Sequence, residues 1–261
     1  MTYENFKNSL NERIFKADLS LEILQTVIEN PQRYTGIFRI TNAKTKLIQN
    51  ITQSHEIKFG DFLEDVFTEY IREMGFDLLD KNINSDLNAD QLFTDKKEIF
   101  LIEQKVIDDH DSTKKRGQFD NLIRKIMALK EKYPNKKINA CMWFCDDALK
   151  KNKKYYLERI DSNTDTLVTT KLYYGAEIFA ELFKRMDVWQ EIVSHLSKNK
   201  NERSKEILEV PDFDNSLEIK ESLKKLKEQK PTLIKKLLSD KDKYKQLRAE
   251  LFPSGETLKG L

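Results

Sequence analysis

Residues 86–105 read Asp-Leu-Asn-Ala-Asp-Gln-Leu-Phe-Thr-Asp-Lys-Lys-Glu-Ile-Phe-Leu-Ile-Glu-Gln-Lys, and this stretch carries the strongest signals for fold and chemistry. Two apolar runs, 89–93 and 99–106, lie on either side of the polar segment 94–98. Apolar runs joined by a short polar turn are typical of a β-hairpin. The sequence therefore predicts one strand that enters the turn and one that leaves it.

The charged residues of this hairpin fall in a fixed pattern. Asp90 starts the first strand, and Glu103 and Lys105 lie on the second. Because side chains alternate between the two faces of a strand, Glu103 and Lys105 share one face and Gln104 points to the other. The second strand is otherwise very apolar, and charged groups on a strand inside a sheet need a function or a partner.

These residue types suit a metal site for cutting a phosphodiester bond. Mg²⁺ takes hard oxygen ligands and keeps several waters, so Asp90, Glu103, the backbone carbonyl of Gln104 and a phosphate oxygen would suffice. Lys105 would orient or activate water and offset phosphate charge. The plain alternative is an exposed ion pair, since an acidic residue followed by Glu-x-Lys also occurs by chance.

The pattern Asp90 followed by Glu103-Gln104-Lys105 resembles the signature of the PD-(D/E)XK nuclease superfamily. This resemblance covers roughly residues 57–145 and implies an α/β fold, a restriction-endonuclease-like core with a central mixed β-sheet flanked by helices, with additional N- and C-terminal helices. Ala89 departs from the proline that many members carry before the Asp. Asp86 competes with Asp90 for the metal role, and we prefer Asp90 because it directly precedes the strand.

Residues 57–74 have the apolar periodicity of a helix, with Phe59, Leu63, Val66, Phe67 and Ile71 on one side. Glu64 lies next to this stripe and is a candidate catalytic residue, placed to reach the metal as a third carboxylate. A solvated helix residue is an equally good interpretation.

Basic side chains follow the hairpin, in the charged segment 108–118. We expect a loop there, followed by a helix over 118–132 and a buried strand over 138–145. Candidate phosphate and DNA contacts in this segment are Lys114, Lys115, Arg116 and Gln118. A solvated loop is the alternative.

A second candidate DNA-contact region precedes the core. Residues 33–53 look polar and irregular, and Asn50 and Gln53 are among side chains that can hydrogen-bond base edges or phosphates. For any single residue, solvated surface remains the default interpretation.

Segments 49–64 and 108–118 loosely resemble restriction enzymes of the HinfI and TdeIII kind. This resemblance implies a type II restriction endonuclease that cuts double-stranded DNA with Mg²⁺. It also implies a homodimer, because a twofold protein matches a twofold site, and a cognate DNA methyltransferase as functional partner. One alternative is a repair or junction-resolving nuclease of the same superfamily, which the sequence preference of cleavage would distinguish from a restriction enzyme. The other is a non-catalytic nucleic-acid-binding protein, which would leave DNA intact in the presence of Mg²⁺.

Composition agrees with this interpretation. The 261 residues carry 46 basic and 44 acidic side chains, so any DNA binding must come from a local basic face. The chain begins Met-Thr-Tyr-Glu, without a basic-then-apolar leader, and has no long apolar run, which predicts a cytoplasmic protein without a membrane partner. The two cysteines, Cys141 and Cys145, are expected to pack as small apolar groups rather than to bridge or bind zinc.

The order of these signals divides the chain into three segments: an N-terminal helical and DNA-contact region (1–56), the nuclease core (57–196) and a lysine-rich helical extension (197–261). Further helices are expected over 3–34, 176–186 and 217–251, with Pro231 breaking or restarting the last. A strand is expected over 167–174 and a polar linker over 197–205.

Overall fold

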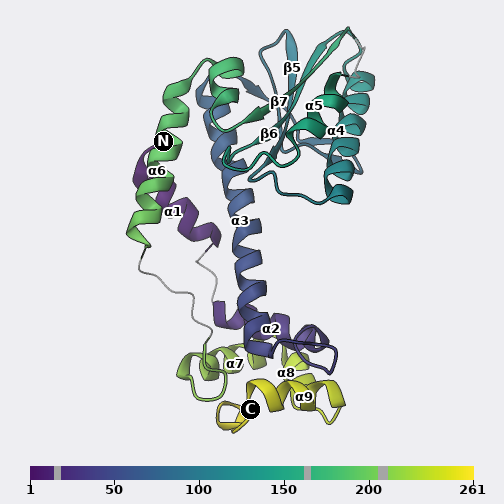
Figure 1. The fold of residues 1–261 in the computed structure, drawn as a ribbon. Coiled ribbons are helices and arrows are strands. Elements are labelled where there is room, and N and C mark those ends of the chain that lie inside the picture. Colours follow the sequence, from purple (N-terminus) through teal and green to yellow (C-terminus); the bar gives the residue numbers. More distant parts are fainter. Residues whose placement is uncertain (15–18, 162–165, 205–210) are drawn as a thin grey trace. The chain divides into compact units, whose positions relative to one another are not determined.

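The computed structural model describes residues 1–14, 19–161, 166–204 and 211–261 (Figure 1). The chain forms two compact units, each assembled from two separate segments. The sheet unit comprises Met1–Phe6 and Gly60–Asn201, and the helical unit comprises Lys7–Phe59 and Glu202–Leu261. The helical unit therefore combines residues of the N-terminal region (1–56) with residues of the C-terminal extension (197–261) that the sequence distinguishes.

A five-stranded mixed sheet lies at the centre of the sheet unit, which agrees with the predicted fold class. Its strand order is β1-β4-β5-β6-β7, with β1, β4 and β5 antiparallel and β5, β6 and β7 parallel. The strands are β1 (Asp77–Leu78), β4 (Gln91–Thr94), β5 (Glu98–Lys105), β6 (Lys137–Phe144) and β7 (Val168–Tyr174). A separate two-stranded sheet joins β2 (Asn82–Asn84) to β3 (Leu87–Asn88).

Strands β4 and β5 form the hairpin that the sequence predicts. Gln91 pairs with Ile102 and Thr94 with Ile99, so one further step in this register sets Asp90 opposite Glu103. The turn is stabilised by Asp95, whose Oδ1 accepts hydrogen bonds from the backbone N–H groups of Lys97 and Glu98. The register is therefore what brings the two carboxylates together.

Helix α4 (Ser112–Lys132) covers one face of the sheet (Figure 1). The alternate residues Ile99 and Leu101 of β5 pack in one core with Phe119 and Leu122 of this helix. Because Glu103 continues the same alternation, its side chain emerges on the α4 face.

The opposite face is aromatic. Phe93 and Phe100 stack with ring centroids 5.1 Å apart, and Trp143 of β6 lies 4.7 Å from Phe67 of helix α3 (Ala43–Glu73). Gln91 and Gln104 project towards this side and are buried. The hairpin is thus packed on both faces, which fixes the positions of its charged residues.

Three sequence expectations about helix limits were wrong. The predicted helix over 3–34 is divided into α1 (Tyr3–Ile14), α2 (Leu19–Glu29) and a 3₁₀ turn, while residues 15–18 lie outside the described chain. The segment 33–53 is not irregular throughout, because α3 begins at Ala43. Helix α4 begins at Ser112 rather than near 118, because the side chain of Asp111 accepts hydrogen bonds from the N–H groups of Thr113 and Lys114.

Two expectations further along the chain also need correction. After helix α5 (Lys153–Asp161) and β7, the expected helix over 176–186 is a short π-helix, Phe179–Phe183, followed by α6 (Met186–Glu202). The predicted polar linker from 197 is mostly the end of α6, and Lys205 lies outside the described residues. Polar residues there line an exposed helix surface, which composition alone does not separate from a loop.

The helical unit has its own core. Helices α7 (Leu217–Gln229), α8 (Pro231–Leu237) and α9 (Asp242–Leu251) pack with α2 and the first turns of α3. Pro231 restarts the chain as the first residue of α8, as the sequence predicts. Among the described residues, no helix is long and apolar enough to cross a membrane.

Candidate active site

Lys105 connects the two carboxylates of the hairpin. Its Nζ donates to Asp90 Oδ2, to Glu103 Oε1 and to the backbone oxygen of Gln104, each at 2.8 Å. Asp90 Oδ2 also accepts from the backbone N–H of Gln104 at 2.7 Å. Four residues that the sequence singled out therefore meet at one ammonium group.

Glu103 has a second partner that the sequence analysis did not identify. Lys125 of α4 donates to Glu103 Oε2, and both side chains are almost fully buried, with 3% and 5% exposed. Each oxygen of Glu103 is thus held by a different lysine. A signal for Lys125 was present, because it lies on the apolar stripe of α4 between Leu122 and Leu129, where a charged residue needs a partner.

The electrostatics of Lys105 follow from this geometry. Burial by itself lowers the pKa of its ammonium, but the charges of Glu103 and Asp90 and the hydrogen bonds to them more than reverse this effect. The pKa of Lys105 is therefore raised, and the group stays protonated. It neutralises one of two adjacent carboxylates, which would otherwise repel each other.

Glu64 of α3 is electrostatically coupled to the same group. Burial, followed by the negative charge of Asp90, raises the pKa of Glu64 to about 7, while Lys105 and Lys81 oppose the rise. A carboxyl with this pKa exchanges its proton near neutral pH, as a general acid or base must.

A polar network fixes α3 against the hairpin at this position. Gln91 Nε2 donates to the backbone oxygen of Glu64 at 2.8 Å, and Gln91 Oε1 accepts from Thr68 Oγ1 at 2.8 Å. Lys81 Nζ in turn donates to Thr68 Oγ1 at 3.1 Å. Gln91 is buried and joins strand to helix, so the backbone of Glu64 is tied to the residue next to Asp90.

The donor set suits a hard divalent cation. Asp90 Oδ2, Glu103 Oε1 and Gln104 O converge on one ammonium, so a cation that replaced the ammonium would meet three oxygens. Within the described part of the chain, no three His, Cys, Asp or Glu side chains are grouped closely enough to hold a metal by themselves. A metal here would need the backbone carbonyl, waters and substrate oxygens, which is the usual coordination of Mg²⁺.

Asp86, the competing candidate, has a different setting. It is exposed in the turn between β2 and β3, and its backbone N–H donates to Asn84 Oδ1. Asp90, in contrast, contacts Lys105 directly.

The basic candidates after the hairpin lie on the first two turns of α4. Lys114 and Arg116 are exposed, while Lys115 Nζ lies 4.7 Å above the ring centre of Tyr155. Gln118 Oε1 accepts from Tyr156 Oη at 3.3 Å. Lys114 and Arg116 are therefore the more available of the four for a nucleic acid.

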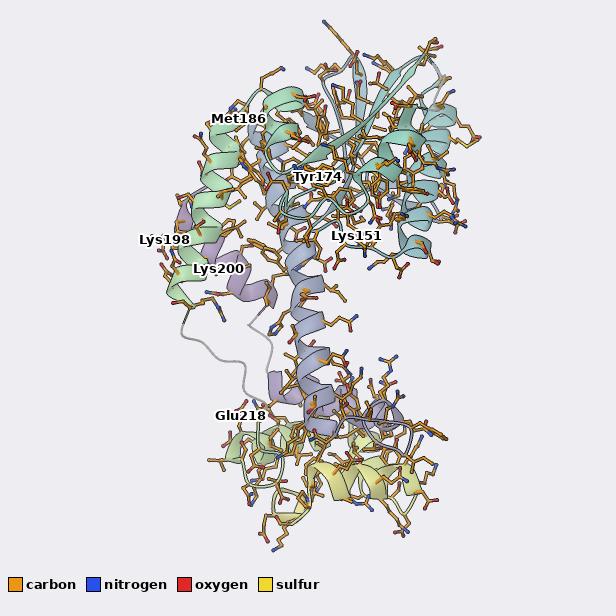
Figure 2. The ribbon with its side chains drawn as sticks, viewed as in Figure 1. Lys151, Tyr174, Met186, Lys198, Lys200 and Glu218 are labelled. Atoms are coloured by element: carbon orange, nitrogen blue, oxygen red, sulfur yellow. The ribbon has the colours of Figure 1, made fainter. Side chains whose placement is uncertain are left out.

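Asp108, three residues after Lys105, is structural. It is fully buried and accepts from Tyr174 Oη at 2.8 Å and from the N–H and the side-chain amide of Asn152. Tyr174 and Lys151, whose backbone N–H donates to Asp108 O, lie close together in Figure 2. Asp108 thus joins the end of β7 to the loop before α5.

Asn50 and Gln53 lie on α3 in the helical unit. Asn50 Nδ2 donates to Tyr34 Oη at 2.9 Å, so part of its hydrogen-bonding capacity is used internally. Both residues line an open hollow of about 610 Å³ together with Arg33, Arg39 and Lys46. Cys141 and Cys145 are both free and lie in or beside β6, as the sequence predicts.

Comparison with known proteins identifies the family. A family model described as type II restriction endonuclease, HinfI, matches residues 2–91 and, in a second overlapping segment, residues 67–200. No curated protein matches the chain significantly. The two family matches together extend over most of the 261 residues and include the whole hairpin site. The chain therefore belongs to the HinfI family of type II restriction endonucleases, which are site-specific deoxyribonucleases.

Proposed function

We propose that this protein is a Mg²⁺-dependent endonuclease that hydrolyses phosphodiester bonds of double-stranded DNA at a specific sequence, with Asp90, Glu103, Lys105 and Glu64 as its catalytic residues. The observation that carries this proposal is the convergence of Asp90 Oδ2, Glu103 Oε1 and Gln104 O on Lys105 Nζ, each at 2.8 Å. Membership of a restriction endonuclease family supports DNA as the substrate.

In this proposal Asp90, Glu103 and the carbonyl of Gln104 bind the metal. Mg²⁺ would polarise the scissile phosphate and make a bound water more acidic. The ammonium of Lys105, which lies beside both carboxylates, would orient the attacking water and offset charge on the phosphate.

Glu64 would transfer protons during the reaction. Its pKa of about 7 allows the carboxylate to accept a proton from water at neutral pH and to release it again. The hydrogen bond from Gln91 to the backbone of Glu64 supports this role, because it limits movement of α3 relative to the hairpin.

DNA contacts would come from basic and amide side chains outside the hairpin. Lys114, Lys115, Arg116 and Gln118 border the site along the chain, and Asn50 and Gln53 lie in the basic hollow of the helical unit. A homodimer would match a symmetric cutting site, and a methyltransferase would protect the host's own copies of that site. The homodimer and the methyltransferase are proposed by analogy with the family, and no contact described above supports them.

The direct test is incubation of purified protein with long unmethylated DNA and Mg²⁺, with a chelator control. Discrete bands from the wild type that disappear with chelator and in Lys105→Ala would support a sequence-specific metal-dependent nuclease. Lys97→Ala is the matched lysine control, since Lys97 is exposed in the hairpin turn. A metal-dependent smear would instead indicate a less selective nuclease, and intact DNA with Mg²⁺ or Mn²⁺ would contradict the proposal.

A second pair of variants tests the choice of carboxylate. Asp90→Asn removes the charge that contacts Lys105, whereas Asp86→Asn removes an exposed charge from the turn between β2 and β3. We expect cleavage to be lost in Asp90→Asn and retained in Asp86→Asn. The opposite result would transfer the metal role to Asp86.

A further inference from the structure

The segment between the 3₁₀ turn Pro31–Arg33 and α3 exposes three large apolar side chains in a row of four residues. Ile37 is 90% exposed, Phe38 is 94% exposed and Ile40 is fully exposed. We call residues 36–42 the apolar loop; it belongs to the helical unit. Isolated apolar residues on a surface are ordinary, but a cluster that includes an almost bare phenylalanine is typical of a binding surface.

The apolar loop has a defined conformation. The N–H of Arg39 donates to Gly36 O at 3.0 Å, which closes a four-residue turn with Ile37 and Phe38 at its tip. Gly36 has a φ of +120°, a conformation that side-chain-bearing residues rarely adopt. The guanidinium of Arg39 also donates to Gln32 O, at 3.3 and 3.2 Å. The apolar tip is therefore presented by hydrogen-bonded backbone, which lowers the entropy cost of inserting it into a partner.

Both ends of the loop are anchored. On the N-terminal side, Tyr34 is buried and Thr35 Oγ1 donates to Pro31 O at 3.2 Å. On the C-terminal side, Asn42 Oδ1 accepts from the N–H of Thr45 at 2.9 Å and so caps the start of α3. The exposed tip is consequently carried between two fixed points.

The surroundings of the loop are positively charged. The adjoining hollow of about 610 Å³ is lined by Arg33, Arg39, Lys46 and Lys58, together with the amides of Asn50 and Gln53 and three other side chains. None of the described residues that line it is acidic. Lys58 Nζ forms an ion pair with Glu22 Oε2 at 3.2 Å. The other cations of the hollow are Arg33, Arg39 and Lys46. A partner that contacts both the apolar loop and the positively charged hollow must present anions next to an apolar surface.

We propose that the apolar loop is a DNA wedge: Phe38, with Ile37, inserts between adjacent base pairs of the bound duplex while the cations of the hollow hold the flanking phosphates. This inference rests on the proposed function, because it takes duplex DNA as the ligand. Stacked bases flanked by phosphates combine an apolar surface with regular negative charge, and apolar side chains that enter the minor groove unstack and kink the duplex. A purely apolar protein partner would supply no counter-charge to Arg33, Arg39 and Lys46 of the hollow.

The wedge gives the enzyme a route to sequence preference without base hydrogen bonds. Unstacking a base step costs an amount of energy that depends on the step, and pyrimidine–purine steps open most easily. The protein would therefore favour sites with a flexible step where Phe38 inserts.

Insertion unwinds DNA, so the test measures linking number. Relaxed plasmid is treated with a topoisomerase that needs no divalent metal, in chelator, with and without the protein, and the topoisomers are separated after deproteinisation. Because the chelator withholds the divalent metal, the test measures unwinding without cleavage of the plasmid by the protein. Phe38→Ser and Ile37→Ser test the wedge, Phe38→Trp restores an aromatic wedge, and Leu217→Ser removes an exposed apolar residue at the start of α7 in the same unit.

We expect the wild type, Phe38→Trp and Leu217→Ser to shift the topoisomer distribution equally. Phe38→Ser should abolish most of the shift and weaken binding to a fluorescent duplex about tenfold, since stacking on an aromatic side chain contributes on the order of 1–3 kcal/mol per base. Equal shifts in all variants, or tight binding without any shift, would overturn the proposal. So would Phe38-dependent binding to anionic vesicles, or Phe38-dependent self-association, in the absence of DNA binding.

The outcome of the unwinding test can be distinguished from the outcome of the cleavage test. If the unwinding depends on Phe38 but no metal-dependent cleavage occurs, the wedge stands and the catalytic proposal fails. If the protein cleaves DNA at discrete sites and Phe38→Ser neither changes the linking number nor weakens binding, the wedge fails and the nuclease stands.

Discussion

Lys125 of α4 donates a hydrogen bond to Oε2 of Glu103 of β5, and both side chains are buried between the helix and the sheet. Because Lys105 binds the other oxygen of the same carboxylate, the two lysines orient Glu103 from opposite ends. Lys125 thus leaves Oε1 as the oxygen that faces Asp90 and Lys105. The position of Glu103 in the hairpin therefore depends on a helix that contributes no residue to the pattern of Asp90 followed by Glu103-Gln104-Lys105.

Replacing Lys125 should lower the stability of the fold. We expect Lys125→Met to lower the free energy of unfolding by about 3 kcal/mol, the lower end for breaking a buried ion pair, because Lys105 still neutralises Glu103. Urea unfolding measures the loss, with Arg124→Ala as a control because Arg124 is exposed on the same helix. In a double-mutant cycle with Glu103→Gln the two losses should not add. Additive losses would show that the two residues do not interact energetically.

Removing Lys105 should separate metal binding from catalysis. Lys105→Ala should slow cleavage by at least about 10²–10³-fold while the protein stays folded and retains much of its DNA binding. Because the ammonium occupies the oxygens that a cation would take, the variant should bind Mg²⁺ more tightly than the wild type. Calorimetric titration with Mg²⁺ measures this difference. Equal affinities in the two proteins would argue against competition between ammonium and metal.

The raised pKa of Glu64 predicts a pH-dependent stability. A carboxyl whose folded-state pKa is about 7, against an ordinary value of 4.5, stabilises the fold below about pH 4.5 and loses this contribution as the pH rises through 7. Glu64→Gln should therefore gain stability relative to the wild type between pH 4.5 and pH 8, by about 1 kcal/mol, since solvent screens part of the effect. Thermal unfolding in chelator checks this, with Glu69→Gln as an exposed control on the same helix. A constant difference across this pH range would contradict the origin given for the shift.

The start of α4 should contribute to DNA affinity through phosphates. Lys114→Ala and Arg116→Ala should each weaken binding to all sequences alike, and each should reduce the slope of log affinity against log salt by about 1. Fluorescence anisotropy at several salt concentrations gives this slope. Lys132→Ala, at the far end of the same helix, is the control. If the slope changes equally in the control, the effect is one of net charge and not of position.

Local patterns predicted the hairpin of β4 and β5 well. The apolar runs, the polar turn and the alternation of side chains determine that Glu103 and Lys105 share a face, and the structure confirms the hairpin and its place in a mixed sheet. Helix starts were predicted less well, because single capping residues such as Asp111 decide them and polar composition conceals them.

The sequence by itself therefore determined the order of helix, hairpin, helix and strand, and the pattern of Asp90 followed by Glu103-Gln104-Lys105. Only the tertiary structure decided that Lys125 reaches Glu103 and that burial, followed by the charge of Asp90, raises the pKa of Glu64. It also decided that Ile37 and Phe38 are exposed beside a basic hollow. The physical reason is that periodicity reports which face of one element is apolar. Which element covers that face, and which charges meet across it, depends on packing between segments far apart in the chain.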